Sequence, residues 1–587
     1  MPNSATQVAQ LQHALDAGNR FKTALHAIDI RRPLHDDHQH DPDTVNDAVN
    51  RLQNDLKVLM QQINETRNAL LSPLYRLHDD LLQEIFLMCT VAQPWRYIMQ
   101  PEEVAQDTVD PLVITWICRR WRDIALRSPV IWTNVTLGPT TWPRALLVKN
   151  PWHPGVLGEE KQRVQNWSRN QIFLERSKKT PLHITLLACR PPIMEKIRDL
   201  FLKENEGRPG PRFLRITDSH LSHSEWTDAT SLMLRCLEAV RDTVEYLSLG
   251  SNYQSENFDT FARSIVCASA SNLHGLRLNG FHLPTKLVPK SEYLNCRFLS
   301  LDRMTATSAL MLLSACPRLQ HLVFRASSQQ LFQEFDLDVV ELPCLRECFL
   351  LGKGIDFSRL LPAIRAPQLH TLKCQLKLWT RQIEDEERRQ EYQQLSRTLT
   401  SFASSSGCSL HALSLTHIPL DFLPETLAAL PSLKSFQYVE DDYYGESYST
   451  LLPEMTARVL CPQLEEIIRH GYCSVKNMMK LERFIRERNT HNTENSLSPI
   501  RRLRLSYDEL QGGPPLFHLP DERRSAKLQK GLAQLLDEIV IGKVGLDKST
   551  MDWVPSSGGG NWLQTWDDYE VTRFLAEFRS WQSRFHY

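Results

Sequence analysis

The sequence has almost no net charge and no long apolar run. Its 587 residues carry 68 Lys and Arg against 69 Asp and Glu, a formal charge of −1. Proteins that coat nucleic acid or an anionic membrane need a basic excess, so neither partner is expected. No window approaches the roughly 18 consecutive apolar residues of a transmembrane helix. The N-terminus also lacks the basic and apolar regions of a signal peptide.

The common signatures of catalysis and metal binding are missing too. Only 22 glycines occur, and none forms a Gly-x4-Gly-Lys-Ser/Thr phosphate loop. The sequence contains no Cys-x-x-Cys, His-Glu-x-x-His or Gly-x-Ser-x-Gly motif. The polar stretch 35–41 has metal-ligand residue types but no second ligand group at a defined spacing, which favours a solvated linker. We therefore expect no catalytic residue, no metal site and no cofactor.

The 13 cysteines do not suggest a disulfide framework. Their number is odd, and residues such as Cys236, Cys316 and Cys374 lie in apolar contexts. Reduced, buried thiols are typical of cytoplasmic or nuclear proteins, so we expect that location.

The chain is long enough for at least two folded units. Residues 1–44 are expected to be flexible or weakly helical. From Val45 to Leu70, apolar residues alternate at spacings of three and four, the pattern of a coiled-coil seam. This pattern predicts a long amphipathic helix over residues 45–72, which could pair with a second chain or pack against its own domain.

A compact helical segment is predicted at residues 73–135. Apolar residues recur at helical spacing from Leu77 to Cys89, and a second helix is expected to carry the apolar residues from Leu112 to Ile124.

Three stretches of this segment resemble the F-box, particularly the form in fungal F-box proteins. Residues 77–86 read Leu-His-Asp-Asp-Leu-Leu-Gln-Glu-Ile-Phe, residues 117–125 read Ile-Cys-Arg-Arg-Trp-Arg-Asp-Ile-Ala, and residues 128–132 read Ser-Pro-Val-Ile-Trp. The preceding helix resembles the coiled segment that often comes before fungal F-boxes. One departure is His78, which stands where the family usually has Pro.

The resemblance implies that this domain docks on the small adaptor of a cullin-RING ubiquitin ligase. The expected adaptor-binding set mixes contact residues with residues that build the domain's own core. It consists of Leu77, His78, Leu81, Leu82, Ile85, Phe86, Trp116, Ile117, Trp121, Ile131 and Trp132. Within this set, Trp121→Ala is expected to weaken adaptor binding.

A motif of the type apolar-x-x-apolar-x-apolar recurs in the region 180–515. Its copies are Val244–Leu249, Leu273–Leu278, Cys296–Leu301, Leu319–Phe324, Leu345–Leu350, Leu369–Cys374, Leu410–Leu415, Leu433–Tyr438 and Ile500–Leu505. The middle anchors between Leu247 and Leu372 are 23 to 29 residues apart, which is the leucine-rich-repeat period. An ordinary α/β domain is the alternative, although so many copies in one phase disfavour it. Charged stretches at 381–397 and 476–489 are interpreted as insertions.

The predicted fold class is therefore α/β. An α-helical F-box-like domain with its preceding long helix is followed by a solenoid of short parallel strands and helical connectors. Residues 136–179 are expected to connect the two, and residues 516–587 to form a helical cap. In that cap, Trp553, Trp562 and Trp566 could instead line a ligand groove.

The residue between the two anchors of each repeat should face the concave side, because side chains alternate along a strand. From this row, the predicted substrate-binding residues are Arg277, Val323, Phe349, Lys373, Gln437 and Arg504. Their mixed character suits a protein or peptide better than nucleic acid. Phe349→Ala with Arg277→Ala is expected to abolish substrate capture and to leave adaptor binding and thermal stability nearly unchanged.

The expected function is binding rather than catalysis. The chain would be the substrate-recognition subunit of an SCF-type E3 ubiquitin ligase, with the adaptor, a cullin bound through it, and an unidentified protein substrate as partners. A leucine-rich-repeat scaffold whose F-box is not coupled to a cullin is the first alternative. A hydrolase or transferase with a nonstandard C-terminal site is the second.

Overall fold

The structure is a computed structural model. It describes residues 12, 16, 42–71, 73–91, 98–99, 109–137, 169–187, 210–218, 240, 242–251, 272–280, 293, 295–326, 339–376, 385–416, 418, 422–439, 455, 460–470, 475–490, 497–508, 531–532 and 534–544. The stretch 35–41 and the three C-terminal tryptophans of the predicted groove lie outside the described residues.

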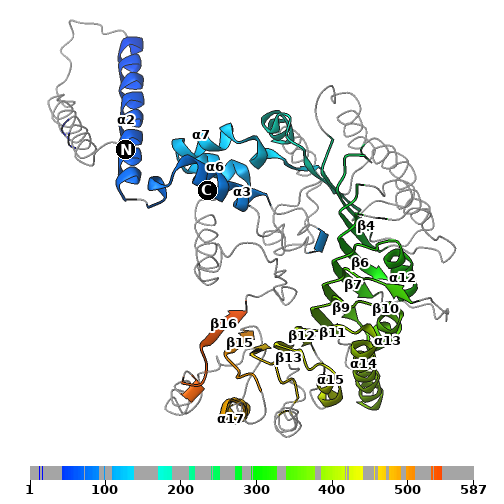
Figure 1. The fold of residues 1–587 in the computed structure, drawn as a ribbon. Coiled ribbons are helices and arrows are strands. Elements are labelled where there is room, and N and C mark those ends of the chain that lie inside the picture. Colours follow the sequence, from blue (N-terminus) through cyan, green and yellow to red (C-terminus); the bar gives the residue numbers. More distant parts are fainter. Residues whose placement is uncertain are drawn as a thin grey trace, which may run out of the picture.

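One long, all-parallel sheet of 14 strands organises the fold, and it follows an arc (Figure 1). In spatial order its strands are β1 (Asn134–Leu137), β2 (His183–Leu187), β3 (Phe213–Asp218), β4 (Tyr246–Ser251), β5 (Gly275–Asn279), β6 (Phe298–Met304), β7 (His321–Ala326), β9 (Glu347–Gly352), β11 (Thr371–Leu376), β12 (Ala412–Thr416), β13 (Ser435–Val439), β14 (Glu466–His470), β15 (Arg502–Asp508) and β16 (Glu538–Val544). Two short strands, β8 (Val340–Glu341) and β10 (Ile364–Arg365), form a separate pair. The protein is thus an α/β protein with a long parallel sheet of the leucine-rich-repeat type.

The register of the sheet aligns the apolar anchors of the repeat. Leu247 pairs with Leu276, and the same row continues through Leu299 and Cys348 to Leu503. These anchors are buried in one continuous apolar core. The prediction of short parallel strands, one per repeat, is confirmed over this region.

Helices line the outer side of the arc (Figure 1). They are α12 (Ala306–Ser314), α13 (Gly354–Leu360), the 3-10 helix η3 (Leu361–Ala363), α14 (Asp385–Ser406), α15 (Pro424–Ala428) and α17 (Val475–Thr490). The two predicted charged insertions overlap α14 and α17. Both helices bury apolar residues, for example Leu395 and Leu481, in the core. Their many exposed charges hid this apolar side in the sequence.

The sheet extends further at both ends than the sequence predicts. Strand β1 follows the helical domain directly and pairs with β2. Strand β16 pairs with β15 inside the region 516–587, where a helical cap was expected. An exposed sheet edge can accept one more strand, and residues Glu538–Val544, rich in the β-branched residues Ile and Val, supply it.

The N-terminal part is helical, as predicted. It comprises α2 (Pro42–Leu71), η1 (Pro73–Arg76), α3 (Asp79–Thr90), α6 (Pro111–Ile117), α7 (Arg119–Arg127) and η2 (Pro129–Trp132). The single helix expected between Leu112 and Ile124 is two helices. Cys118 has extended backbone angles (φ −158°, ψ 168°), and its Sγ caps α7 by accepting a hydrogen bond from the Trp121 N–H at 3.5 Å.

Trp132 joins the helical domain to the repeat. The fully buried indole donates from Nε1 to the Ala125 carbonyl oxygen at 2.8 Å. Its ring lies 5.2 Å from that of Phe173, and the Arg176 guanidinium stacks on it at 4.4 Å. The domain and the sheet therefore share one core, which fixes one against the other.

Asp356 makes the stability of the repeat depend on pH. This residue is 1% exposed near the start of α13, where its Oδ2 accepts a hydrogen bond from the Lys353 N–H at 2.9 Å. Burial raises the pKa of the carboxyl group to about 6. The native state then binds more protons than the unfolded state between about pH 4 and 6, so stability falls as pH rises through that window.

Asp356→Asn should therefore stabilise the protein by about 2 kcal/mol at pH 7.5, since the ionised form is the one that burial penalises. The gain should shrink by more than half at pH 4.5. Urea denaturation at the two pH values measures it. An equal gain at both would contradict the assignment.

Candidate protein-interaction surfaces

The helical domain has a closed core on one side of α3. Leu82 and Phe86, four residues apart, are at most 1% exposed, and the Phe86 ring lies 4.8 Å from that of Trp121. Ile131 and Trp132 are fully buried as well. These members of the expected adaptor-binding set build the domain, so any contribution they make to binding is indirect.

Other members of the set face solvent. Leu81 is 54% exposed, and Trp116 at the end of α6 is 71% exposed. Met88, seven residues after Leu81 and on the same side of α3, is 61% exposed, and Val130 is 39% exposed. We call Leu81, Met88, Trp116 and Val130 the exposed apolar set. The sequence reading missed Met88, although its spacing from Leu81 was a signal. Leu77, Ile85 and Ile117 are half-buried.

An arginine–aspartate contact fixes the start of α3 beside Leu81. Arg120 donates from Nε and Nη2 to Asp79 Oδ1 at 3.0 and 2.7 Å, and from Nη2 to the Leu77 carbonyl oxygen at 2.5 Å. Arg127 reaches the other carboxylate oxygen of Asp79 at 3.2 Å. The hydrogen bond from Arg120 lowers the pKa of Asp79. The Cys-Arg-Arg-Trp stretch thus holds the helix that carries Leu81.

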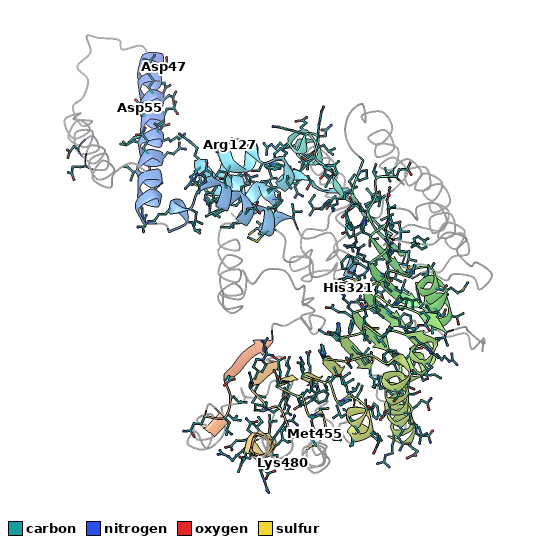
Figure 2. The ribbon with its side chains drawn as sticks, viewed as in Figure 1. Asp47, Asp55, Arg127, His321, Met455 and Lys480 are labelled. Atoms are coloured by element: carbon teal, nitrogen blue, oxygen red, sulfur yellow. The ribbon has the colours of Figure 1, made fainter. Side chains whose placement is uncertain are left out.

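The second candidate surface is the concave face of the sheet, opposite the anchors. The first residues of strands β2 to β7 and of β9 pair in register, and we call them the first concave row. They are His183, Phe213, Tyr246, Gly275, Phe298, His321 and Glu347. The second concave row, two positions on, is Ser248, Arg277, Ser300, Val323, Phe349, Lys373, Ser414, Gln437, Ile468 and Arg504. Figure 2 places His321 on the strands, away from Arg127 in the helical domain. All six predicted substrate-binding residues lie in the second row.

Part of this face is covered by the chain itself. Ile98 and Met99, the short blue segment beside the strands in Figure 1, are 0% and 1% exposed. They form an apolar cluster with residues of both rows. Its other members are Phe213, Val323, Tyr246, Phe298 and Phe349.

Arg277 holds the main chain of this segment. The side chain, 6% exposed, donates from Nη1 to the Ile98 carbonyl oxygen at 3.2 Å and from Nη2 to Asp302 Oδ2 at 3.1 Å. Arg325 donates to the same Asp302 oxygen at 3.2 Å. Replacing Arg277 by Ala removes a buried ion pair, so the Phe349→Ala, Arg277→Ala variant is expected to lose thermal stability, in contrast to what the sequence alone suggests.

The distal half of the second row is more open and polar. Lys373 and Gln437 are half-buried. Arg504 is 45% exposed, with Nε 3.3 Å from Glu466 Oε1, and Ser435 donates to Glu466 Oε2 at 2.7 Å. The predicted substrate-binding residues therefore lie in two environments, one apolar and covered, the other polar and accessible.

Burial raises the pKa of thiols in the repeat core, Cys374 and Cys461 among them. Burial raises the pKa of Cys348 to about 12, the opposite of what a nucleophilic thiolate needs. Within the described part of the chain, no group of three or more His, Cys, Asp or Glu could hold a metal ion. No described helix is both long and apolar enough to span a membrane.

No protein-family model and no curated protein matches the sequence. The solved structures that match the chain include the following three. The leucine-rich repeat-containing protein LegL7 from Legionella pneumophila is 13% identical, with a TM-score of 0.31, covering 69% of this chain and 98% of its own. A protein from Bacteroides fragilis is 12% identical, with a TM-score of 0.28 and coverages of 56% and 74%. A leucine-rich-repeat protein from Leptospira interrogans is 12% identical, with a TM-score of 0.22 and coverages of 63% and 91%.

The repeat in the sequence and the aligned anchors in the sheet give the chain the architecture of a leucine-rich-repeat protein.

Proposed function

We propose that the protein is the substrate-recognition subunit of an SCF-type E3 ubiquitin ligase. In this role, residues 73–135 bind the adaptor, which bridges to a cullin, and the repeat binds a protein substrate. Other subunits transfer the ubiquitin, so the chain contributes binding alone. The assignment joins the F-box resemblance to the leucine-rich-repeat architecture.

The exposed apolar set is the observation that carries the proposal. Trp116 is 71% exposed, whereas Phe86 and Trp132 of the same domain are at most 1% exposed. Large apolar side chains that stay in solvent beside a well-formed core mark an interaction surface. Trp is also the residue type most often found at the energetic centre of protein interfaces.

A leucine-rich-repeat scaffold without a cullin is the second candidate. His78 favours it, because this side chain is 77% exposed at the position of the family's usual Pro. Its imidazole pairs with Asp80 Oδ2 at 3.1 Å, which places a polar group beside Leu81.

Co-expression of the full chain with the SCF adaptor and cullin tests the proposal. The wild type should co-elute with both, and Leu81→Asp should not, since a charge in a desolvated interface is costly. Met479→Asp is the matched control, because Met479 is 58% exposed on α17 in the repeat. A folded wild-type chain that leaves the adaptor unbound would support the scaffold instead.

His78→Pro should keep or raise adaptor affinity. The backbone at His78 has φ −64° and ψ 151°, angles that Pro adopts without strain. The change should also stabilise the domain by about 0.5 kcal/mol, by reducing the freedom of the unfolded chain. Calorimetric titration with the adaptor measures the affinity. A tenfold loss would mean that the domain docks in another way.

A further inference from the structure

Gly275 leaves a gap between two aromatic residues of the first concave row, and Ile98 fills it. In the first concave row, Gly275 is flanked by Tyr246 on β4 and Phe298 on β6. A Cβ atom at Gly275 would lie 2.8 Å from Tyr246 Cδ1 and 3.2 Å from Ile98 Cγ1. Glycine is therefore needed for the Ile98 side chain to reach the sheet between two aromatic residues.

An acidic residue of the sheet orients the hydrogen-bond donor beside this gap. Asp302 holds the Arg277 guanidinium through Nη2, which leaves Nη1 to bind the Ile98 carbonyl oxygen. A hydrogen bond to a main-chain carbonyl is available to any peptide. Val323 and Phe349 add apolar surface next to it. The face thus offers a place for an aliphatic side chain and a fixed donor for a main-chain oxygen.

We propose that this face binds a short apolar segment of a partner protein, and that Ile98 and Met99 occupy it as an internal mimic. The partner presents an aliphatic side chain over Gly275 and the carbonyl of the same residue to Arg277. The further statement that this partner is a substrate for ubiquitination rests on the proposed function. The binding site itself does not, because peptide binding is measured without the adaptor.

The internal segment must compete with the partner. A short tether presents its segment at an effective concentration on the order of 1 mM, so an external peptide of micromolar affinity is largely excluded. Removing the side chains of Ile98 and Met99 should release the site. The apparent affinity of an external peptide should then rise at least tenfold.

Fluorescence polarisation with the full chain tests this. The probe is a labelled synthetic peptide spanning residues 94–103, and the control peptide carries Asp in place of Ile98 and Met99. The Ile98→Ala, Met99→Ala variant should bind the probe at least tenfold more tightly than the wild type, and should bind the control peptide at least tenfold more weakly than the probe. Adding Gly275→Leu should abolish probe binding, because the new side chain takes the place of Ile98.

The proposal would be overturned if a folded Ile98→Ala, Met99→Ala variant did not bind the probe, or if it bound the probe and the control peptide equally. So would loss of folding in this variant and in Met99→Ala alone, because the segment would then be a permanent part of the core. A wild-type dimer that dissociates on Ile98→Ala would overturn it as well, by assigning the face to a second copy of the chain. None of these outcomes changes the expectation that the wild-type chain co-elutes with the adaptor and cullin, so the two proposals are tested separately.

Discussion

Trp116→Ala is expected to weaken adaptor binding about 30-fold, the equivalent of about 2 kcal/mol, while the domain stays folded. The indole is 71% exposed in the free protein, so its removal costs the core little. In a complex it would be desolvated, and truncation of a desolvated Trp commonly costs this much. Titration of the full-length variant with purified adaptor measures the loss, and a thermal melt checks the fold.

Trp121→Ala is the informative comparison. The sequence points to Trp121 as an anchor, but its ring packs 4.8 Å from that of Phe86 in the domain core. Its truncation should lower the melting temperature and adaptor binding together, whereas Trp116→Ala should lower binding alone. Unchanged affinity in Trp116→Ala would remove the exposed apolar set from the proposed interface.

The periodicity of the sequence was enough to predict the sheet but not what lies on it. Anchors such as Leu276 and Leu299 recur because every repeat must bury the same strand positions, and such a rule can be read from spacing. The contact between Ile98 and Arg277 joins residues 179 positions apart and belongs to no repeat. Gly275 inside a strand signals a close approach, but nothing local in the sequence identifies Ile98 as the residue that approaches it, so the covered half of the concave face could not be foreseen.

The helical domain shows the same limit. Helical spacing marks two apolar sides of α3, one containing Leu82 and Phe86 and the other Leu81 and Met88. Which side is buried depends on α6 and α7, and therefore on the break at Cys118 that sets their directions. The F-box resemblance supplies the family pattern of apolar positions, while the division into core and surface comes from tertiary packing.

The largest expected loss of stability is at Arg488, on α17. This side chain is 1% exposed and donates to five main-chain carbonyl oxygens. Their residues are Leu460, Cys461, Pro462, Leu464 and Ser498, at distances from 2.8 to 3.4 Å. Burial lowers the pKa of Arg488 to about 10, so the guanidinium remains charged at neutral pH.

Arg488→Met should lower the free energy of unfolding of the repeat by about 3 to 5 kcal/mol, because it removes five hydrogen bonds to main-chain carbonyls, of which those of Cys461 and Pro462 keep a main-chain donor. Arg488→Lys should recover only part of this, since one ammonium group cannot span the five oxygens as the planar guanidinium does. Arg486→Met on the same helix is the matched control. Arg486 is 53% exposed and pairs with Glu482 at 2.7 Å, an arrangement worth well under about 1 kcal/mol. Urea denaturation of the three variants measures the differences. Similar losses for Arg488→Met and Arg486→Met would show that the carbonyl cluster is not what holds α17 against the sheet.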